Sequence, residues 1–167
     1  MGFGSMRHER KLGKDDWATP LNVFYDACKL YAVNPKLDVC AAYGTNKCAK
    51  FYSKQENALQ YNWKWSWFCN PPYNDKVTWV EYANDQFKLW GKTGIMLLPN
   101  AFTDTECFHN IIYNQDKCRP HIEVYFHKGR IKFEPNGNSP VSGSIWIIWS
   151  NDNLNKRRKN YKWVDPN

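Results

Sequence analysis

The sequence predicts a single α/β domain whose sheet is mostly parallel, and three observations support this class. Short apolar runs typical of buried strands alternate with segments whose apolar residues recur every three or four positions, as in helices. The last two predicted strands follow one another without a helix between them, which favours antiparallel pairing. The chain has 167 residues, the usual size of one domain.

The first predicted elements follow residue 16, because residues 1–16 mix glycine, serine and charged residues without a periodic pattern. We expect that stretch to be a mobile leader. Thr19 and Pro20 predict the start of a helix, with Thr19 as the N-cap and Pro20 in the first helical position. Apolar residues at helical spacing extend this helix to about Tyr31, and a short buried strand is expected over 36–42.

The middle of the chain continues this alternation after a polar and irregular stretch, 43–62. Residues 63–69 are aromatic and typical of a strand. The strand must end at the following pair of prolines, 71–72, because neither has an N–H group to donate to a sheet. A helix is then predicted over 77–90, and a continuous buried strand over 94–98.

The last third of the chain predicts a third helix over 103–114, then strands over 121–126 and 144–149 with a turn at Gly129 between them. The remaining residues, 151–167, are mostly polar and basic, so we expect them to form a C-terminal tail. Such a tail either lies on phosphate groups or is simply solvated.

The charge of the chain favours a polyanionic partner, because the formal net charge is +7 and the pI is about 9.1. A basic surface that serves only solubility is the alternative. Aromatic residues make up 17% of the chain, and they are either core residues or platforms on which bases stack.

Several classes of protein are excluded by what the sequence lacks. No run approaches the roughly 18 consecutive apolar residues of a membrane span, and the first residues lack the apolar stretch of a signal peptide. We therefore expect a soluble protein in the cytoplasm. The six cysteines include no C-x-x-C pair, so we expect neither a disulfide framework nor a bound metal.

Four consecutive residues carry the clearest chemistry: Asn70, Pro71, Pro72 and Tyr73. They follow a predicted strand, and parallel α/β sheets bind ligands at the carboxyl ends of their strands. The Asn70 side-chain oxygen and the Pro71 carbonyl can accept both hydrogens of a planar amino group, while Tyr73 offers a face for stacking. An amine held in this way can attack a methyl sulfonium without prior deprotonation. The segment therefore indicates amino methylation, with a simple turn as the structural alternative.

The NPPY string at 70–73 matches the motif of S-adenosylmethionine-dependent amino methyltransferases, in the form usual for adenine N6 and for protein glutamine. Over about residues 15–150, the chain resembles the phage-type DNA N-6-adenine methyltransferase (Dam) family. The resemblance is carried by seven short motifs in the family's order: WxTP at 17–20, LDVCAA at 37–42, NKCA at 46–49, FCNPPY at 68–73, LLP at 97–99, TDT at 103–105 and GRIKF at 129–133.

The resemblance implies a compact Rossmann-like methyltransferase fold for residues 17–150, with a mostly parallel sheet and an antiparallel final strand. It also implies S-adenosyl-L-methionine as the cofactor. Val39 stands where the family commonly has Pro, and Ala41 stands where Gly is frequent, so the glycine-rich loop of the first cofactor motif is absent. A sulfonium cofactor has no phosphate that would need such a loop. The implied cofactor-binding residues are Trp17, Thr19, Pro20, Asp38, Val39, Cys40, Ala41, Glu56 and Asn57.

For the substrate, the resemblance implies an adenine flipped out of its duplex and clamped between Tyr73 and an aromatic residue on the opposite face, Phe133. Arg130 and Lys132 flank that position and either bind the nucleic-acid backbone or remain solvated. Asp104 is a weaker site candidate, since an acidic residue there can equally cap the third helix.

The implied activity is that of an adenine-specific DNA methyltransferase, with residues 70–73 as its catalytic segment. Its partner is expected to be double-stranded DNA, with single-stranded DNA as an alternative, and its location is the host cytoplasm if a phage encodes it. Three other acceptors would suit the same chemistry, namely cytosine N4, adenine in RNA and a protein glutamine. A non-catalytic nucleic-acid-binding module is the alternative from another class.

Overall fold

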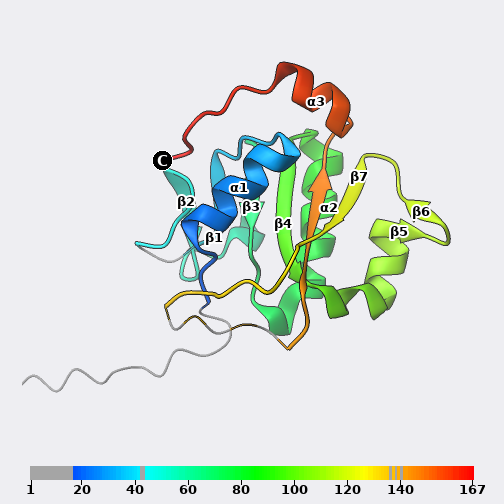
Figure 1. Ribbon diagram of the computed structural model, residues 1–167, viewed down its shortest axis with the longest axis horizontal. Coiled ribbons are helices and arrows are strands. Elements are labelled where there is room, and N and C mark those ends of the chain that lie inside the picture. The colour runs from blue at the N-terminus through cyan, green and yellow to red at the C-terminus, as the bar shows by residue number, and fades with distance from the viewer. Residues whose placement is uncertain (1–16, 42–43, 136, 138, 140) are drawn as a thin grey trace, which may run out of the picture.

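The computed structural model describes residues 17–41, 44–135, 137, 139 and 141–167, so the expected leader, residues 1–16, lies outside the described part. Six strands form one sheet in the order β2-β1-β3-β4-β8-β7 (Figure 1). Their bounds are β1 Leu37–Ala41, β2 Lys50–Ser53, β3 Trp67–Cys69, β4 Gly94–Pro99, β7 Ile122–Phe126 and β8 Ser144–Trp149.

The sheet is mostly parallel. Strand β1 pairs in parallel with β2 and β3, and β3 pairs in parallel with β4. Strand β8 runs antiparallel to both of its neighbours, β4 and β7. The predicted α/β class, with a mostly parallel sheet and an antiparallel final strand, is therefore confirmed, as is the antiparallel pairing of the last two strands.

Helices cover both faces of this sheet, and shorter elements fill the connections. None of the described helices is long and apolar enough to cross a membrane. The α-helices are α1 Leu21–Tyr31, α2 Lys76–Trp90 and α3 Leu154–Asn160. The short elements are the 3₁₀ turns η2 Ala58–Gln60, η3 Tyr73–Asp75 and η4 Asn100–Asp104, the π-helical turn η5 Phe108–Ile112, and a hairpin of β5 Tyr113–Asn114 and β6 Lys117–Cys118.

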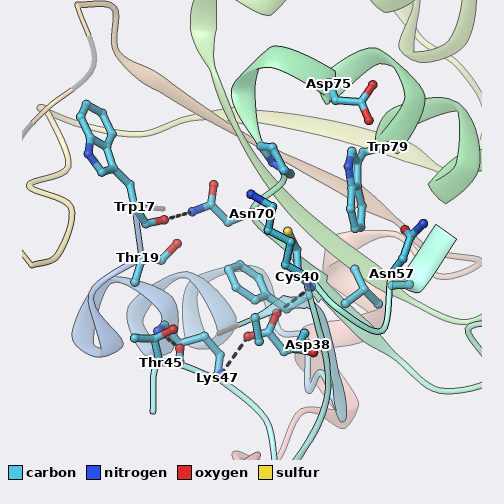
Figure 2. Close-up of a pocket in the computed structure, with 18 of the residues that line it drawn as sticks. Trp17, Thr19, Asp38, Cys40, Thr45, Lys47, Asn57, Asn70, Asp75 and Trp79 are labelled. Atoms are coloured by element: carbon cyan, nitrogen blue, oxygen red, sulfur yellow. Dashed lines mark hydrogen bonds between the residues drawn. The ribbon is translucent and has the colours of Figure 1, made fainter. Parts of the chain in front are cut away.

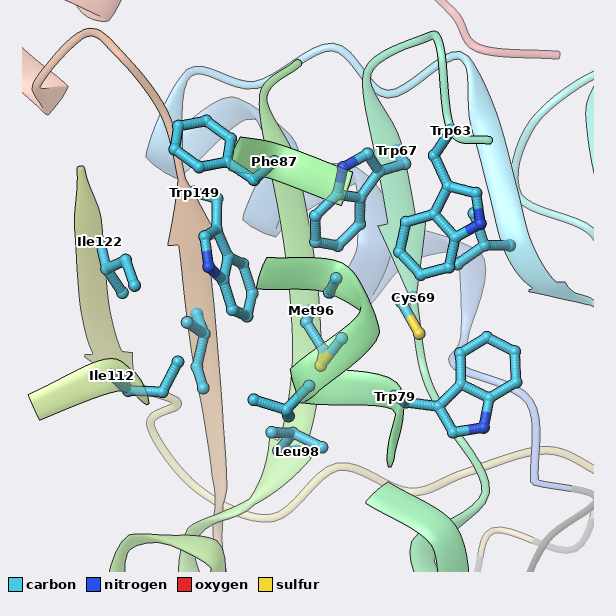
Figure 3. Close-up of a cluster of buried hydrophobic side chains, with 14 of the residues drawn as sticks. Trp63, Trp67, Cys69, Trp79, Phe87, Met96, Leu98, Ile112, Ile122 and Trp149 are labelled. Atoms are coloured by element: carbon cyan, nitrogen blue, oxygen red, sulfur yellow. The ribbon is translucent and has the colours of Figure 1, made fainter. Parts of the chain in front are cut away.

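Alternate side chains of the central strands enter two separate cores, because successive strand residues point to opposite faces of a sheet. In β4, Ile95 and Leu97 pack with α1, whereas Met96 and Leu98 pack with α2. Figure 3 shows the α2 side of the sheet, where Met96 and Leu98 lie below Trp67 and Trp149. Both faces of the sheet are therefore buried, as the continuous apolar run of β4 predicts.

Tryptophan packing fixes the position of β3, the strand that leads into residues 70–73. Trp67 is fully buried, and its ring lies 5.1 Å from that of Trp63 and 5.5 Å from that of Trp149, measured between centroids. On the neighbouring strand, a Cβ atom at Gly94 would lie 2.0 Å from two ring atoms of Trp67. The indole thus occupies the space that the missing side chain of Gly94 leaves free.

The first helix starts one residue later than predicted. Pro20 is its N-cap, Leu21 its first residue, and no side chain caps it. The reason is that residue 18 pairs with Glu134 in an antiparallel bridge that keeps the chain extended, and a residue before proline also favours an extended backbone. Thr19 is therefore not the cap, and its hydroxyl is free for another role.

The predicted third helix, 103–114, is wrong as a continuous α-helix, because the segment forms η4, η5 and the first strand of the β5–β6 hairpin. Two threonine hydroxyls compete for backbone carbonyls here: Thr103 Oγ1 donates to Asn100 O at 2.8 Å and Thr105 Oγ1 to Phe102 O at 2.7 Å. The sequence also missed strand β2 within 43–62, and the strand predicted over 63–69 comprises only its last three residues.

The C-terminal residues pack against the domain. Within them, α3 contains Arg157, which is buried and forms an ion pair with Glu123 at 2.7 Å. Arg157 also donates from Nε to the carbonyl of Tyr31 at 3.1 Å, which attaches α3 to the end of α1. Trp163 then packs edge-on against Tyr25 of α1. These contacts differ from the expected polar tail. The guanidinium of Arg157 is already bound to Glu123 and to the carbonyl of Tyr31, so it is not available to phosphate groups.

Candidate active site

A pocket of about 710 Å³ opens where β1, β2 and β3 end. This is the carboxyl edge of the parallel strands, and the volume lies within the range of small-molecule sites. The walls include residues 17–19, the end of β1, residues 53–54 and 57–59, the start of the 70–73 motif, and the pair Glu134 and Pro135. The position agrees with the site that the strand order predicts.

Asn70 occupies the centre of this pocket, directly after β3 (Figure 2). Its side-chain nitrogen donates to the carbonyl of Trp17 at 3.1 Å, which fixes the amide plane. Its Oδ1 atom is buried and has no hydrogen-bond partner among the described residues. A buried acceptor without a donor is costly, so this oxygen is available to a hydrogen-bond donor that enters the pocket.

The three residues after Asn70 turn the chain into helix α2. Pro71 is buried and Pro72 lines the pocket. Tyr73 opens the turn η3 and is partly exposed, although its hydroxyl is buried without a partner among the described residues. Burial raises the pKa of Tyr73, so the phenol stays protonated at neutral pH. The motif is thus a rigid turn at the rim of the pocket.

The rings beside this turn are not arranged as the expected clamp. Phe133 is only 1% exposed and stacks on Trp17, with ring centroids 5.7 Å apart and planes 19° apart. Its ring meets that of Tyr73 edge-on, at 6.4 Å and 89°. A flat base would need two parallel faces, so Tyr73 and Phe133 do not form a clamp in this structure. The reason is that Trp17 occupies the face of Phe133.

Asp38 organises the loop that follows β1. It is 2% exposed, and its two carboxylate oxygens accept from the backbone N–H groups of Cys40 at 3.2 Å and of Lys47 at 2.9 Å. Burial raises the pKa of Asp38 to about 6, while these two hydrogen bonds and the charge of Lys47 act in the opposite direction. Asp38 lines the pocket, and both of its oxygens are already used to shape it.

Seven of the nine residues expected at the cofactor line the pocket, and two do not. Glu56 is exposed, and its carboxylate accepts from the N–H of Ser53 at 2.8 Å, which lowers its pKa and closes a local turn. Pro20 serves as the N-cap of α1. The residues found in the lining are Trp17, Thr19, Asp38, Val39, Cys40, Ala41 and Asn57.

The charged candidates for the substrate lie outside the pocket lining. Arg130 and Lys132 are exposed on the segment that leads to Glu134 at the pocket wall. Asp104 is exposed at the end of η4 and is not one of the lining residues. Asp104 does not cap a helix either, since the N–H of Phe108 is accepted by the neighbouring Thr105 hydroxyl at 3.2 Å.

Sequence reasoning missed three notable pocket residues: Lys47, Lys54 and Trp79. Lys47 belongs to the NKCA motif, so the motif itself was the available signal. Trp79 is a buried residue of α2, and its sequence neighbourhood carries no ligand signal. Among the described residues, no group of three or more His, Cys, Asp or Glu side chains could hold a metal ion.

Comparison with known proteins places this chain in a family. Residues 7–159 match the family model described as DNA N-6-adenine-methyltransferase (Dam). The chain is 33% identical over 129 residues to the DNA N-6-adenine-methyltransferase of Haemophilus phage HP1 (strain HP1c1), covering 76% of this chain and 70% of that protein. It is also 36% identical over 73 residues to YfdM of Escherichia coli (strain K12), a proposed methyltransferase, covering 40% of this chain and 79% of that protein. This chain therefore belongs to the DNA N-6-adenine-methyltransferase (Dam) family.

Proposed function

We propose that this protein transfers a methyl group from S-adenosyl-L-methionine to N6 of adenine in DNA. Beside the family membership, one structural observation supports this proposal. Asn70 Oδ1 is a buried acceptor without a partner among the described residues, and Asn70 lines a pocket of cofactor size at the carboxyl end of a parallel strand. An exocyclic amino group would supply the missing donor.

The pocket residues suit the cofactor on two sides. On one side, Thr19 is 2% exposed and its hydroxyl has no partner among the described residues. On the other, Trp79 offers an apolar face on the same side of the pocket as the amide of Asn57, which suits an adenine ring (Figure 2). We place the amino-acid end of the cofactor near Thr19 and its adenine near Trp79. When bound, the cofactor supplies an electrophilic methyl group on a sulfonium.

Asn70 then has two tasks in the reaction. Its link to Trp17 holds the amide so that Oδ1 accepts a hydrogen of the adenine amine and turns the nitrogen lone pair toward the methyl carbon. The bound cofactor would supply the methyl group to the adenine nitrogen and leave as a neutral thioether, and the proton lost from that nitrogen would pass to water. Holding the reacting atoms about 3 to 3.5 Å apart accounts for much of the acceleration.

The target adenine has to leave its duplex to reach Asn70, at a cost of a few kcal/mol of unstacking. We propose that it enters beside Tyr73 and Trp17, the two partly exposed rings near Asn70, and stacks on one of them; these rings also meet edge-on, at 6.4 Å and 78°, so they form no parallel clamp either. Phe133 then supports Trp17 from behind and does not touch the base. Double-stranded DNA is the proposed substrate, and the cytoplasm is the proposed location.

Exposed lysine and arginine side chains precede Glu134 of the pocket wall in the sequence, and they are suited to bind the DNA backbone. Lys128, Arg130 and Lys132 are exposed on the segment between β7 and Glu134, while Ile131 and Phe133 of the same segment are buried. The two buried residues anchor the segment that carries these cations. Phosphate contacts of this kind set register without reading sequence.

Asn70→Ala is the test of this function. Methyl transfer to DNA, measured with labelled cofactor and nucleoside analysis, should fall by at least about 100-fold, which is typical when one aligned transition-state group is removed. Binding of cofactor and DNA should change little. The control is Asn110→Ala, an exposed residue of η5 outside the pocket lining, which should keep full activity.

The same assay separates the alternatives. Parallel reactions with duplex DNA, single-stranded DNA, RNA and protein identify the acceptor by where the label enters. Label in cytosine N4, RNA or glutamine alone would contradict the proposal. A wild-type protein that binds DNA but shows no cofactor binding by calorimetry would point to a non-catalytic binding module.

A further inference from the structure

Lys47 is a buried cation in the wall of the pocket. Lys47 is 4% exposed, and its Nζ donates to the carbonyl of Thr45. No carboxylate lies within ion-pair distance of that Nζ among the described residues. Asp38 contacts the backbone N–H of Lys47, and not its ammonium group.

This burial leaves Lys47 short of an anionic partner. Burial lowers the pKa of Lys47, and the charges of Asp38 and Glu134 only act against that shift from a distance. Buried charges in proteins are normally paired, because a desolvated ammonium without a counter-ion is costly. An anion that entered the pocket beside Lys47 would remove this cost, so the site favours a ligand with a negative group at this position.

A second polar atom supports the same position. Thr19 Oγ1 is buried without a partner among the described residues, and Thr19 and Lys47 both line the pocket. Figure 2 shows Thr19, Thr45 and Lys47 on one side of Asn70, and Asn57 and Trp79 on the other. The pocket therefore has a hydrogen-bonding cationic end and an aromatic end, with the Asn70 acceptor between them.

We propose that Lys47 binds the α-carboxylate of the methyl donor, with the hydroxyl of Thr19 as a second donor to the same group. This inference rests on the proposed function, because it assumes that the donor is S-adenosylmethionine. The α-carboxylate is the only anionic group of that molecule, whereas its sulfonium and ammonium are cations. Lys47 is thus a positioning residue that fixes the amino-acid end and holds the methyl carbon in line with Asn70.

The test compares two ligands that differ in this one group. Calorimetry measures the affinity of the full-length protein for S-adenosylmethionine and for decarboxylated S-adenosylmethionine, which keeps the adenine, the sulfonium and the amine. Wild type should bind the carboxylated donor about 10- to 100-fold more tightly, the range expected for hydrogen bonds to a charged group. Lys47→Met should reduce that ratio to about one by weakening the carboxylated donor alone. Lys47→Arg, which keeps the charge, should preserve most of the ratio.

Lys54 offers a matched control, since it lines the same pocket but is exposed. Lys54→Met should leave the ratio of the two affinities as it is in wild type. If wild type binds the two donors with nearly equal affinity, the inference is wrong, whatever the variants do. It is also wrong if Lys54→Met removes the preference for the carboxylated donor and Lys47→Met does not. If Lys47→Met does not fold, judged by circular dichroism, Lys47→Gln and Thr19→Val provide the same readout.

The two proposals fail in different ways. A wild-type protein that binds neither donor contradicts the proposed function itself. A wild-type protein that binds both donors equally and still methylates adenine contradicts only the assignment of Lys47.

Discussion

Replacing Arg157 with Met tests whether the C-terminal residues are part of the folded domain. The Arg157 side chain is 6% exposed and that of its partner Glu123 is 27% exposed. The substitution removes the 2.7 Å ion pair and the hydrogen bonds to the carbonyls of Tyr31, at 3.1 Å, and Asp152, at 2.6 Å. Breaking a fully buried pair costs about 3–5 kcal/mol, and the partial exposure of Glu123 favours the lower end, so we expect a loss of about 3 kcal/mol.

Urea denaturation followed by circular dichroism measures this loss, and the melting temperature should fall by about 6–12 °C for a chain of this size. Lys156→Met is the control, because the neighbouring pair of Lys156 and Asp152 is exposed at 64% and 42%, and its loss should cost about 0.5 kcal/mol or less. Adding Glu123→Gln to Arg157→Met should recover part of the loss, since the carboxylate no longer lacks a partner. If Arg157→Met and Lys156→Met have equal and small effects, the anchoring role of Arg157 is wrong.

Three further predictions concern packing, pH and DNA. Gly94→Ala places a Cβ 2.0 Å from the ring of Trp67, so the free energy of unfolding should fall by about 1–3 kcal/mol. A variant whose midpoint of urea unfolding equals that of wild type would refute this close approach. The raised pKa of Asp38, about 6 against an ordinary 3.8, means that the folded state holds its proton more tightly than the unfolded state. This contribution to stability is full below pH 3.8 and is lost as the pH rises through about 6. Between pH 3.5 and pH 7, the free energy of unfolding of wild type should therefore fall by up to about 3 kcal/mol relative to that of Asp38→Asn. A difference in melting temperature between the two proteins that does not change with pH would contradict this. Arg130→Gln and Lys132→Gln should each weaken DNA binding for all sequences and reduce the slope of log affinity against log salt by about one, and an unchanged slope would place both side chains off the DNA.

Elements with a local signal can be predicted from the order of the residues alone. The apolar runs of β4 and β8 were predicted almost to the residue, and α2 was predicted to within one residue, because hydrophobic periodicity depends only on near neighbours. The motif at 70–73 was likewise placed at the end of a buried strand, since prolines must end a strand wherever they occur. Family membership followed from the order of such short motifs.

Which of these residues meet depends on the packing of distant segments. Phe133 and Trp17 lie more than one hundred positions apart in the sequence, so their stacking, which removes Phe133 from the expected base clamp, has no local signal. The burial of Lys47 and of Arg157 has no local signal either, because lysine and arginine side chains are mostly exposed in proteins. Burial and pairing depend on which distant segments cover a side chain, and that is a property of the packed chain, whereas periodicity and chain breaks are properties of neighbouring residues.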